Sequence, residues 1–267
     1  MRAVSLNEDA LLVTSAFWQT NAVAVRAGGE TLLIDSPYLP NELEALPGVL
    51  AGAGFEADGL LATHGDFDHL LGRYAYPGMS LGVGESTALR FREQPGQAQR
   101  DLRAFDAEFY VERPGPLALG SFQSLPVPGR LDLGTGEGAA EIELHPAEGH
   151  TSDGTAFFLR SLGVIVLGDY VSAVEIPWIS RDGSLEDYLA TLARLEPLIS
   201  EAQVVVPGHG PSHVRDEALR LLHEDVAYLE ELKGGNEGVG LPAGRDSRAQ
   251  KKIHAENLER AQGGSST

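Results

Sequence analysis

The sequence of 267 residues contains no cysteine. This absence excludes disulfide bonds, thiolate metal ligands and a cysteine nucleophile, and it is typical of a protein that folds in the cytoplasm. Basic residues are also scarce, because 20 Lys and Arg stand against 39 Asp and Glu, which gives a formal net charge of −19. Such a surface repels phosphate backbones and anionic lipids, so we expect neither a nucleic acid nor a membrane as a partner.

Long apolar runs are missing as well. No stretch approaches the roughly 20 apolar residues of a membrane span, and acidic residues interrupt segment 1–20 where a signal peptide would have its apolar run. The composition is otherwise ordinary, with 42% hydrophobic and 22% charged residues. We therefore predict a single globular domain over residues 1–262, followed by a disordered tail, 263–267.

Strand-like and helix-like segments alternate along the chain. Four apolar, β-branched segments predict strands at 10–14, 21–26, 31–35 and 59–63. A helix is expected at 41–52, although Pro47 should kink or split it. The middle of the chain carries mostly short strand candidates, among them 108–112, and amphipathic helices follow from Ser184 and from Val214. This alternation predicts an α/β architecture.

Four side chains of the kinds that bind metals fall within six residues, directly after the apolar segment 59–63. They are His64, Asp66, Asp68 and His69. In an extended or tight-loop backbone, residues 64, 66 and 68 point to one side, because side-chain direction has a period of two, and His69 can turn to a second metal. Imidazole and carboxylate groups suit zinc, manganese or iron. The alternative is a polar loop with chance histidines.

Three further candidate ligands follow apolar segments later in the chain. His150 lies in Gly-His-Thr, Asp169 in Gly-Asp after Val-Ile-Val-Leu, and His209 in Pro-Gly-His-Gly after Val-Val-Val. Because α/β folds gather their active-site groups at the carboxyl ends of strands, we expect these side chains to meet the first cluster. Each alone is more often a turn residue, but the set in this order is specific.

The set of motifs resembles the metallo-β-lactamase superfamily, which includes glyoxalase II, lactonases and many other hydrolases. The first motif of that family, His-x-His-x-Asp-His, is followed by Gly-His-Thr, Gly-Asp and Gly-His, and residues 20–23 and 33–35 are similar to its first strands. The resemblance covers residues from about 10 to 230. It implies a four-layer αββα sandwich of the α+β or α/β class, with two β-sheets face to face and helices outside.

The resemblance also implies two divalent metal ions, with zinc as the first expectation and manganese or iron as alternatives. The implied ligands of the first metal are His64, Asp66 and His150. The implied ligands of the second metal are Asp68, His69 and His209, and Asp169 would bridge both. By resemblance, a hydroxide that bridges the metals would attack the substrate, and Asp68 beside it could shuttle its proton.

The sequence departs from the family pattern at Asp66, where a second histidine is expected. The change replaces a neutral ligand by an anion, so the first site resembles two histidines and a carboxylate, which suits iron or manganese at least as well as zinc. Diiron relatives carry Glu at this place, and they normally carry a flavin domain for which this chain has no room. A milder departure is Thr-Ser-Asp-Gly at 151–154 in place of the more usual Thr-Pro-Gly.

We therefore expect a metal-dependent hydrolase that acts on a small molecule, namely an ester, a thioester or a lactone. The alternatives are a phosphodiesterase, a nonheme diiron redox protein with a separate electron donor, and a binding protein that has lost turnover. Tyr170 and Trp178 are candidates for substrate contact, and segment 172–183 could form an apolar wall over the site. Asp35 could orient a ligand histidine or simply end its strand.

Overall fold

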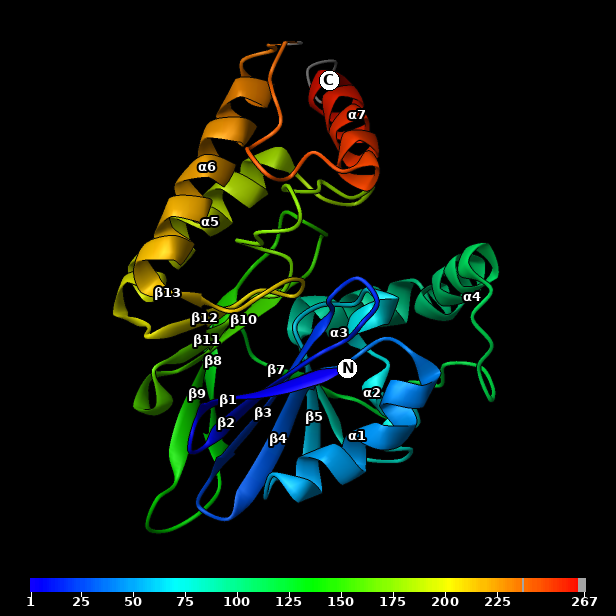
Figure 1. The fold of residues 1–267 in the computed structure, drawn as a ribbon, viewed down its shortest axis with the longest axis vertical. Coiled ribbons are helices and arrows are strands. Elements are labelled where there is room, and N and C mark those ends of the chain that lie inside the picture. Colours follow the sequence, from blue (N-terminus) through cyan, green and yellow to red (C-terminus); the bar gives the residue numbers. More distant parts are fainter. Residues whose placement is uncertain (237, 264–267) are drawn as a thin grey trace.

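Two β-sheets lie face to face in the computed structural model, which describes residues 1–236 and 238–263 (Figure 1). The first sheet contains, in order, β1 (Arg2–Asn7), β2 (Ala10–Thr14), β3 (Asn21–Ala27), β4 (Glu30–Asp35), β5 (Gly59–Ala62), β6 (Leu81–Gly84) and β7 (Gln123–Leu125). The second contains, in order, β13 (His213–Val214), β12 (Val204–Val206), β11 (Val164–Val166), β10 (Thr155–Leu159), β9 (Ala140–Pro146) and β8 (Gly129–Leu133). The four strands predicted in the first quarter of the chain are confirmed to within one residue.

Helices cover the outer face of each sheet (Figure 1). On the first sheet they are α1 (Pro40–Gly52), α2 (Gly72–Ala75), α3 (Glu85–Glu93) and α4 (Gln97–Phe109). On the second sheet they are α5 (Leu185–Glu201) and α6 (Arg215–Lys233), with α7 (Arg248–Gly263) packed against α6. Short 3-10 turns, η1 (Phe67–His69) and η2 (Arg160–Leu162), complete the elements named here.

The strands are apolar on both faces because each sheet is covered on both sides. In β2, Leu12 faces the second sheet, whereas Leu11 and Val13 face the helices. Side-chain direction alternates along a strand, so a run of consecutive apolar residues is what such a buried strand requires. The resulting order of helix, sheet, sheet and helix is the αββα sandwich that the sequence analysis expected.

Parallel pairing brings the segments that carry the candidate ligands to one end of the sheets. β4 and β5 are parallel, so the ends that carry Asp35 and the His64 segment lie together. β11 and β12 are also parallel, so the chain leaves them side by side towards Asp169 and His209. At this end the Asn21 N–H donates a hydrogen bond of 2.8 Å to the Gly208 carbonyl oxygen, which joins the two sheets.

Two details of the helices differ from the expectations. Helix α1 does not split at Pro47, because its buried residues Leu43, Leu46 and Leu50 hold both halves against the first sheet. The strand expected at 108–112 is wrong, since residues 108 and 109 are the end of α4 and residues 110–112 form no strand. Spacings of three and four residues place Leu102, Phe105 and Phe109 on one apolar stripe of that helix.

Two further expectations concern the C-terminal tail and membrane-spanning helices. Helix α7 extends through Gly263, so the expected tail begins inside it, and residues 264–267 lie outside the described residues. Along 1–236 and 238–263, no helix combines the length and the apolar character that crossing a bilayer requires.

Candidate metal centre

The candidate ligands of the sequence analysis come together at one end of the two sheets. Two triads match the implied sets, because the ligand atoms of each lie within 4.8 Å of one another. The first triad is His64, Asp66 and His150. The second triad is Asp68, His69 and His209. Residues from four loops, following β5, β9, β11 and β12, thus build one cluster around Asp169.

Asp169 lies between the two triads and turns one carboxylate oxygen to each. Its Oδ2 is 3.3 Å from His150 Nε2 and 3.8 Å from His64 Nε2. Its Oδ1 is 3.2 Å from His69 Nε2 and 3.6 Å from His209 Nε2. This division is what a carboxylate that bridges two cations requires.

Several atoms of the cluster are buried without a hydrogen-bond partner. Among the described residues these include Nε2 of His64, His69 and His150, and Oδ1 of Asp169. Leaving buried polar atoms unpaired costs about 1–3 kcal/mol each, so a group of them that converges on one place is not expected without a partner. Imidazole nitrogens and carboxylate oxygens are ligands of zinc, manganese and iron, so the residues fit a pair of such cations.

The other ring nitrogen of each histidine is tied to an acceptor outside the cluster. Nδ1 of His150 donates to the Trp178 carbonyl oxygen at 2.8 Å, and Nδ1 of His209 donates to the Trp18 carbonyl oxygen at 3.0 Å. Nδ1 of His64 lies 3.1 Å from Thr63 Oγ1. A proton held on Nδ1 leaves the lone pair of Nε2 free to bind a cation.

Asp35 orients His69, the fourth histidine of the cluster. Of the two roles expected for Asp35, orienting a ligand histidine or only ending its strand, the structure shows the first. Its Oδ2 accepts hydrogen bonds from His69 Nδ1 at 2.9 Å and from Thr63 Oγ1 at 2.8 Å, and its Oδ1 accepts from the Thr63 N–H at 2.8 Å. Its φ of 58° lies in the left-handed region, which few residues other than glycine adopt. The strand end is therefore bent to hold this carboxylate beneath His69.

Asp66, which replaces the expected histidine, is paired with Arg90 of α3. Arg90 Nη2 lies 2.8 Å from Asp66 Oδ1, and its Nη1 lies 2.7 Å from Asp153 Oδ1. The other oxygen of Asp66 faces the first triad, 3.6 Å from His150 Nε2. Burial raises the pKa of Asp66, but the neighbouring imidazole of His150 and the charges of His64 and Arg90 outweigh it, so that the pKa falls well below its usual range. Asp66 is thus held as an anion.

Arg90 could not be predicted from the sequence because the pair joins residues far apart in the chain. No local pattern connects an arginine in the middle of a polar helix with a loop 24 residues earlier. Asp153 belongs to the segment 151–154 that departs from the usual Thr-Pro-Gly, and the structure shows which groups it binds. Its Oδ2 accepts a hydrogen bond from the Gly65 N–H at 2.8 Å, so it fixes both Arg90 and the loop of the first motif.

Tyr170 and Trp178 lie near the cluster but differ in accessibility. Tyr170 is 3% exposed, and its hydroxyl donates to the Ala147 carbonyl oxygen and accepts from the His150 N–H. In this structure Tyr170 supports the His150 loop, and its contact with a substrate stays a prediction. Trp178 is half-buried, with its ring centroid 5.4 Å from that of His150, so it keeps its place as a candidate contact.

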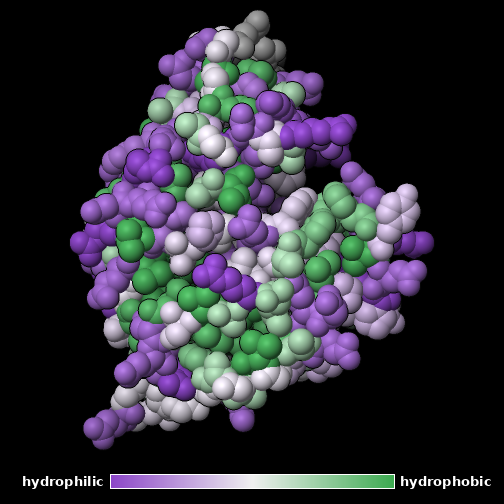
Figure 2. Space-filling model, in the orientation of Figure 1, coloured by the Kyte–Doolittle hydropathy of each residue, from purple (hydrophilic) through white to green (hydrophobic). Residues whose placement is uncertain are grey.

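Trp18 is a second aromatic neighbour of the cluster, which the sequence analysis missed. Its side chain is 41% exposed, its ring centroid lies 5.9 Å from that of His209, and it packs on Phe17 and Phe105. Figure 2 shows hydrophobic residues gathered on the lobe that α3 and α4 form beside the notch in the surface. The only sign of this aromatic contact in the sequence was the pair Phe17 and Trp18, which lies between the strands predicted at 10–14 and 21–26.

Glu175 was also missed, and it completes another group. Its carboxylate lies with Asp169 and His209 in a triad whose ligand atoms are within 4.8 Å of one another. Burial raises the pKa of Glu175, and the neighbouring charges of Asp169 and Asp68 act in the same direction against the opposing effect of His209. Glu175 belongs to segment 172–183, which the sequence analysis expected to be an apolar wall.

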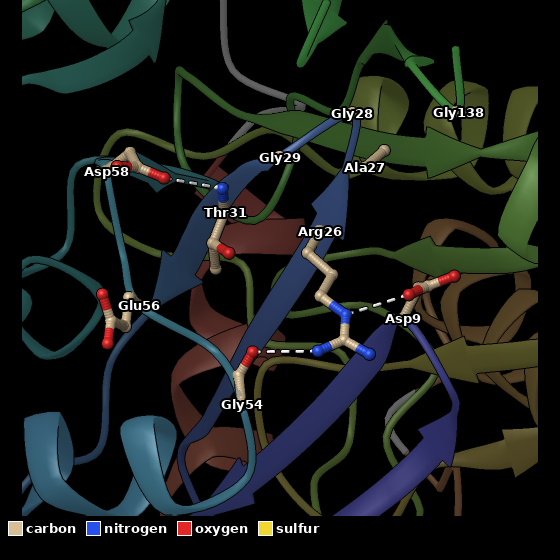
Figure 3. A pocket seen from close by; sticks show the side chains of 10 residues that line it. All are labelled: Asp9, Arg26, Ala27, Gly28, Gly29, Thr31, Gly54, Glu56, Asp58 and Gly138. Atoms are coloured by element: carbon tan, nitrogen blue, oxygen red, sulfur yellow. Dashed lines mark hydrogen bonds and ion pairs between the residues drawn. The ribbon is translucent and has the colours of Figure 1, made fainter.

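A separate hollow of about 490 Å³ lies near the β3–β4 turn, at the far end of the first sheet from Asp35 (Figure 3). Three of its four charged side chains are engaged with neighbouring groups. Arg26 donates to Asp9 and to the Gly54 carbonyl oxygen at 2.9 Å each, and Asp58 accepts from the Thr31 N–H. These contacts close the turns at this end of the sheet, and the hollow offers no group comparable to the metal cluster.

Comparison with known proteins identifies the fold. No family model matches the sequence, and no curated protein matches it. A metallo-β-lactamase family protein from Thermus thermophilus matches with a TM-score of 0.68 and 20% identity, over 96% of this chain and 90% of that chain. The protein TTHA1623 in a di-iron-bound form matches with a TM-score of 0.60 and 22% identity, over 79% of this chain and 97% of that chain.

A third solved structure extends the likeness to a larger enzyme. The stereoselective inverting sec-alkylsulfatase Pisa1 from Pseudomonas sp. matches with a TM-score of 0.70 and 12% identity, over 97% of this chain and 49% of that chain. The chain therefore has the metallo-β-lactamase fold, as the motifs predicted. At these identities the likeness concerns the fold, so the effect of Asp66 on the metal stays a prediction.

Proposed function

We propose that this protein is a metal-dependent hydrolase with a dinuclear site, acting on a small ester, thioester or lactone. The observation that carries the proposal is the division of the Asp169 carboxylate between two triads with unpartnered, inward-facing nitrogens. Proteins of the same fold support it, since one is described as a sulfatase and another as di-iron-bound. We further propose a cytoplasmic location and partners that include neither nucleic acid nor membrane, from the charge and the lack of cysteine.

The proposed ligands follow the geometry. His64, Asp66 and His150 would hold one divalent cation. Asp68, His69 and His209 would hold the other, and Asp169 would bind both. Two such cations supply Lewis-acid activation of a water molecule and of the substrate's carbonyl oxygen at neutral pH.

The chain's own residues would orient the reaction and move its proton. Asp68 is buried, with Oδ2 3.3 Å from His209 Nε2, so it is placed to receive a proton from the attacking water at the floor of the site. The hydrogen bonds of the Nδ1 atoms to fixed acceptors keep the four imidazoles in place during turnover. Trp18 and Trp178 flank the cluster from two sides, and we propose that they contact the apolar part of the substrate.

The test is a hydrolysis screen with short-chain and long-chain esters, thioesters, lactones and phosphodiesters. Wild-type protein and the Asp169→Ala variant are compared, each with and without added manganese, iron(II) or zinc. We expect turnover of one of the first three classes by the wild type only, and its loss on treatment with a chelator. Equal turnover by both proteins would contradict the proposal. Turnover of phosphodiesters alone would identify phosphodiesters, and not esters, thioesters or lactones, as the substrate class.

A redox role is the second candidate, because Asp66 gives the first triad a carboxylate and a structural neighbour is described as di-iron-bound. Iron that is oxidised and reduced reversibly, together with consumption of oxygen or nitric oxide from an added electron donor, would favour this role. Hydrolysis that is as fast with zinc as with iron would favour the first proposal.

A further inference from the structure

The segment that follows Asp169 brings one more carboxylate to the metal cluster. The chain turns at 172–176, and the Glu175 side chain points back so that its ligand atom lies within 4.8 Å of those of Asp169 and His209. Within the described part of the chain, no hydrogen bond or ion pair engages the Glu175 carboxylate itself. The carboxylate thus faces the cluster without any partner of its own.

The turn that carries Glu175 is fixed on both sides, so this placement is built into the fold. Ser172 Oγ donates to the His209 carbonyl oxygen at 2.9 Å and accepts from the N–H groups of Val174 and Glu175 at 3.1 Å each. Arg245 Nη1 donates to the carbonyl oxygens of Ser172 and Glu175, at 3.1 and 2.9 Å. The Arg245 side chain is only 1% exposed and is paired with Asp225 of α6, which anchors the turn to the helices of the second sheet.

The charges around Glu175 are those of a cation site. Asp169 lies beside it and the charge of Asp68 also acts on it, while the charge of His209 opposes both, and like charges at close range in a buried site repel unless a cation lies between them. The His69 imidazole is fully buried, and its unpartnered Nε2 lies 3.2 Å from Asp169 Oδ1, the oxygen on the side of the second triad. Glu175 therefore lies close to Asp169 and His209, and both of these residues also neighbour the unpartnered nitrogen of His69.

We propose that Glu175 is a further ligand of the second metal, in addition to Asp68, His69, His209 and Asp169. The inference rests on the proposed dinuclear site and adds a residue to it. Three carboxylates and two imidazoles form an oxygen-rich set, and such sets suit manganese(II) or iron(II), which accept five or six ligands, better than four-coordinate zinc. The second position is thereby tuned towards these harder cations.

The experiment is a titration of metal-free, full-length protein with MnCl₂, in which the electron paramagnetic resonance signal of free Mn²⁺ reports binding. Wild type is compared with Glu175→Gln, and the matched control is Glu137→Gln, which changes an exposed glutamate in the β8–β9 loop. A parallel titration with Zn²⁺ uses a chromophoric chelator as competitor. Thermal melting of each metal-free protein checks that the variants fold.

We expect Glu175→Gln to weaken one of two Mn²⁺ sites by at least about 10-fold, the lower end of what even the loss of an outer-shell partner produces. The other site and the control should be unchanged, and Zn²⁺ binding should weaken less than Mn²⁺ binding. Because the substitution removes a repelling charge, the metal-free variant should melt no lower than the wild type.

Three outcomes would overturn the inference, and they differ in what else they affect. If wild type and Glu175→Gln bind two Mn²⁺ with equal affinity, Glu175 is not a ligand, whereas the dinuclear site stands. If the wild type binds neither Mn²⁺ nor Zn²⁺, the proposed function fails together with the inference. A Glu175→Gln protein that melts well below the wild type would show that the carboxylate has a structural role instead.

Discussion

Asp35 offers a sharp test of how the site is organised, because Asp35→Asn changes its hydrogen bonding with little effect on shape. Asparagine tolerates the left-handed backbone that residue 35 adopts, so the strand end should keep its geometry. The carboxylate now accepts three hydrogen bonds, from Thr63 N–H, Thr63 Oγ1 and His69 Nδ1. An amide has only one acceptor oxygen. If that oxygen stays on the Thr63 N–H, the amide NH₂ group faces His69 Nδ1.

An NH₂ group beside His69 Nδ1 reverses the tautomer of the imidazole. Nδ1 then accepts, the ring proton moves to Nε2, and the atom that faces the cluster can no longer bind a cation. Loss of such an orienting partner typically costs 10–100-fold in metal affinity, or about 1.4–2.8 kcal/mol. Since His69 belongs to the second triad, only one of two sites should weaken.

The assay for Asp35→Asn is metal titration of the chelator-treated protein, with nitrogen-15 spectra of the imidazoles to identify the tautomer of His69. Asp58→Asn is the matched control, because Asp58 accepts from the Thr31 N–H at 2.9 Å near the opposite end of the same strand. Unchanged affinity at both sites in Asp35→Asn, or equal weakening in the control, would refute the orienting role.

Three further substitutions follow from the same geometry. Asp169→Ala removes the shared carboxylate, so elemental analysis should show loss of both metals, with a circular dichroism spectrum like that of the wild type; retained metal would contradict this. Arg90→Met leaves the Asp66 and Asp153 carboxylates without their cation, so urea unfolding of the metal-free protein should show a loss of about 3 kcal/mol, and less with metal bound. Trp18→Ala should raise KM for substrates with an apolar acyl group while leaving the melting temperature nearly unchanged, because the side chain is 41% exposed.

The sequence was sufficient for the fold and for the candidate ligands because both depend on local patterns. Buried strands appear as apolar runs, and the ligands follow directly after four of the strands of the two sheets. The capped start of α5 is confirmed in the same way, since the Ser184 hydroxyl accepts from the Asp187 N–H. Each of these features can be read within a few neighbouring residues.

The features that the sequence did not reveal depend on contacts between distant segments. Arg90 reaches Asp66 and Asp153 from another helix, and Arg245 holds the Glu175 turn from 70 residues further along the chain. Charged residues are common on polar helices and loops, so nothing local marks these as buried partners. Tyr170 is a related case, because adjacency to Asp169 suggested a substrate contact, whereas its packing in the core and its support of the His150 loop depend on distant segments.

The central claim is that the two triads and Asp169 hold two metal ions. The most direct measurement is elemental analysis of metals per chain, on protein purified without chelators or added metal and again after incubation with manganese, iron(II) or zinc. The account predicts about two equivalents in the wild type. A wild-type protein that is folded but takes up no metal under any of these conditions would contradict it.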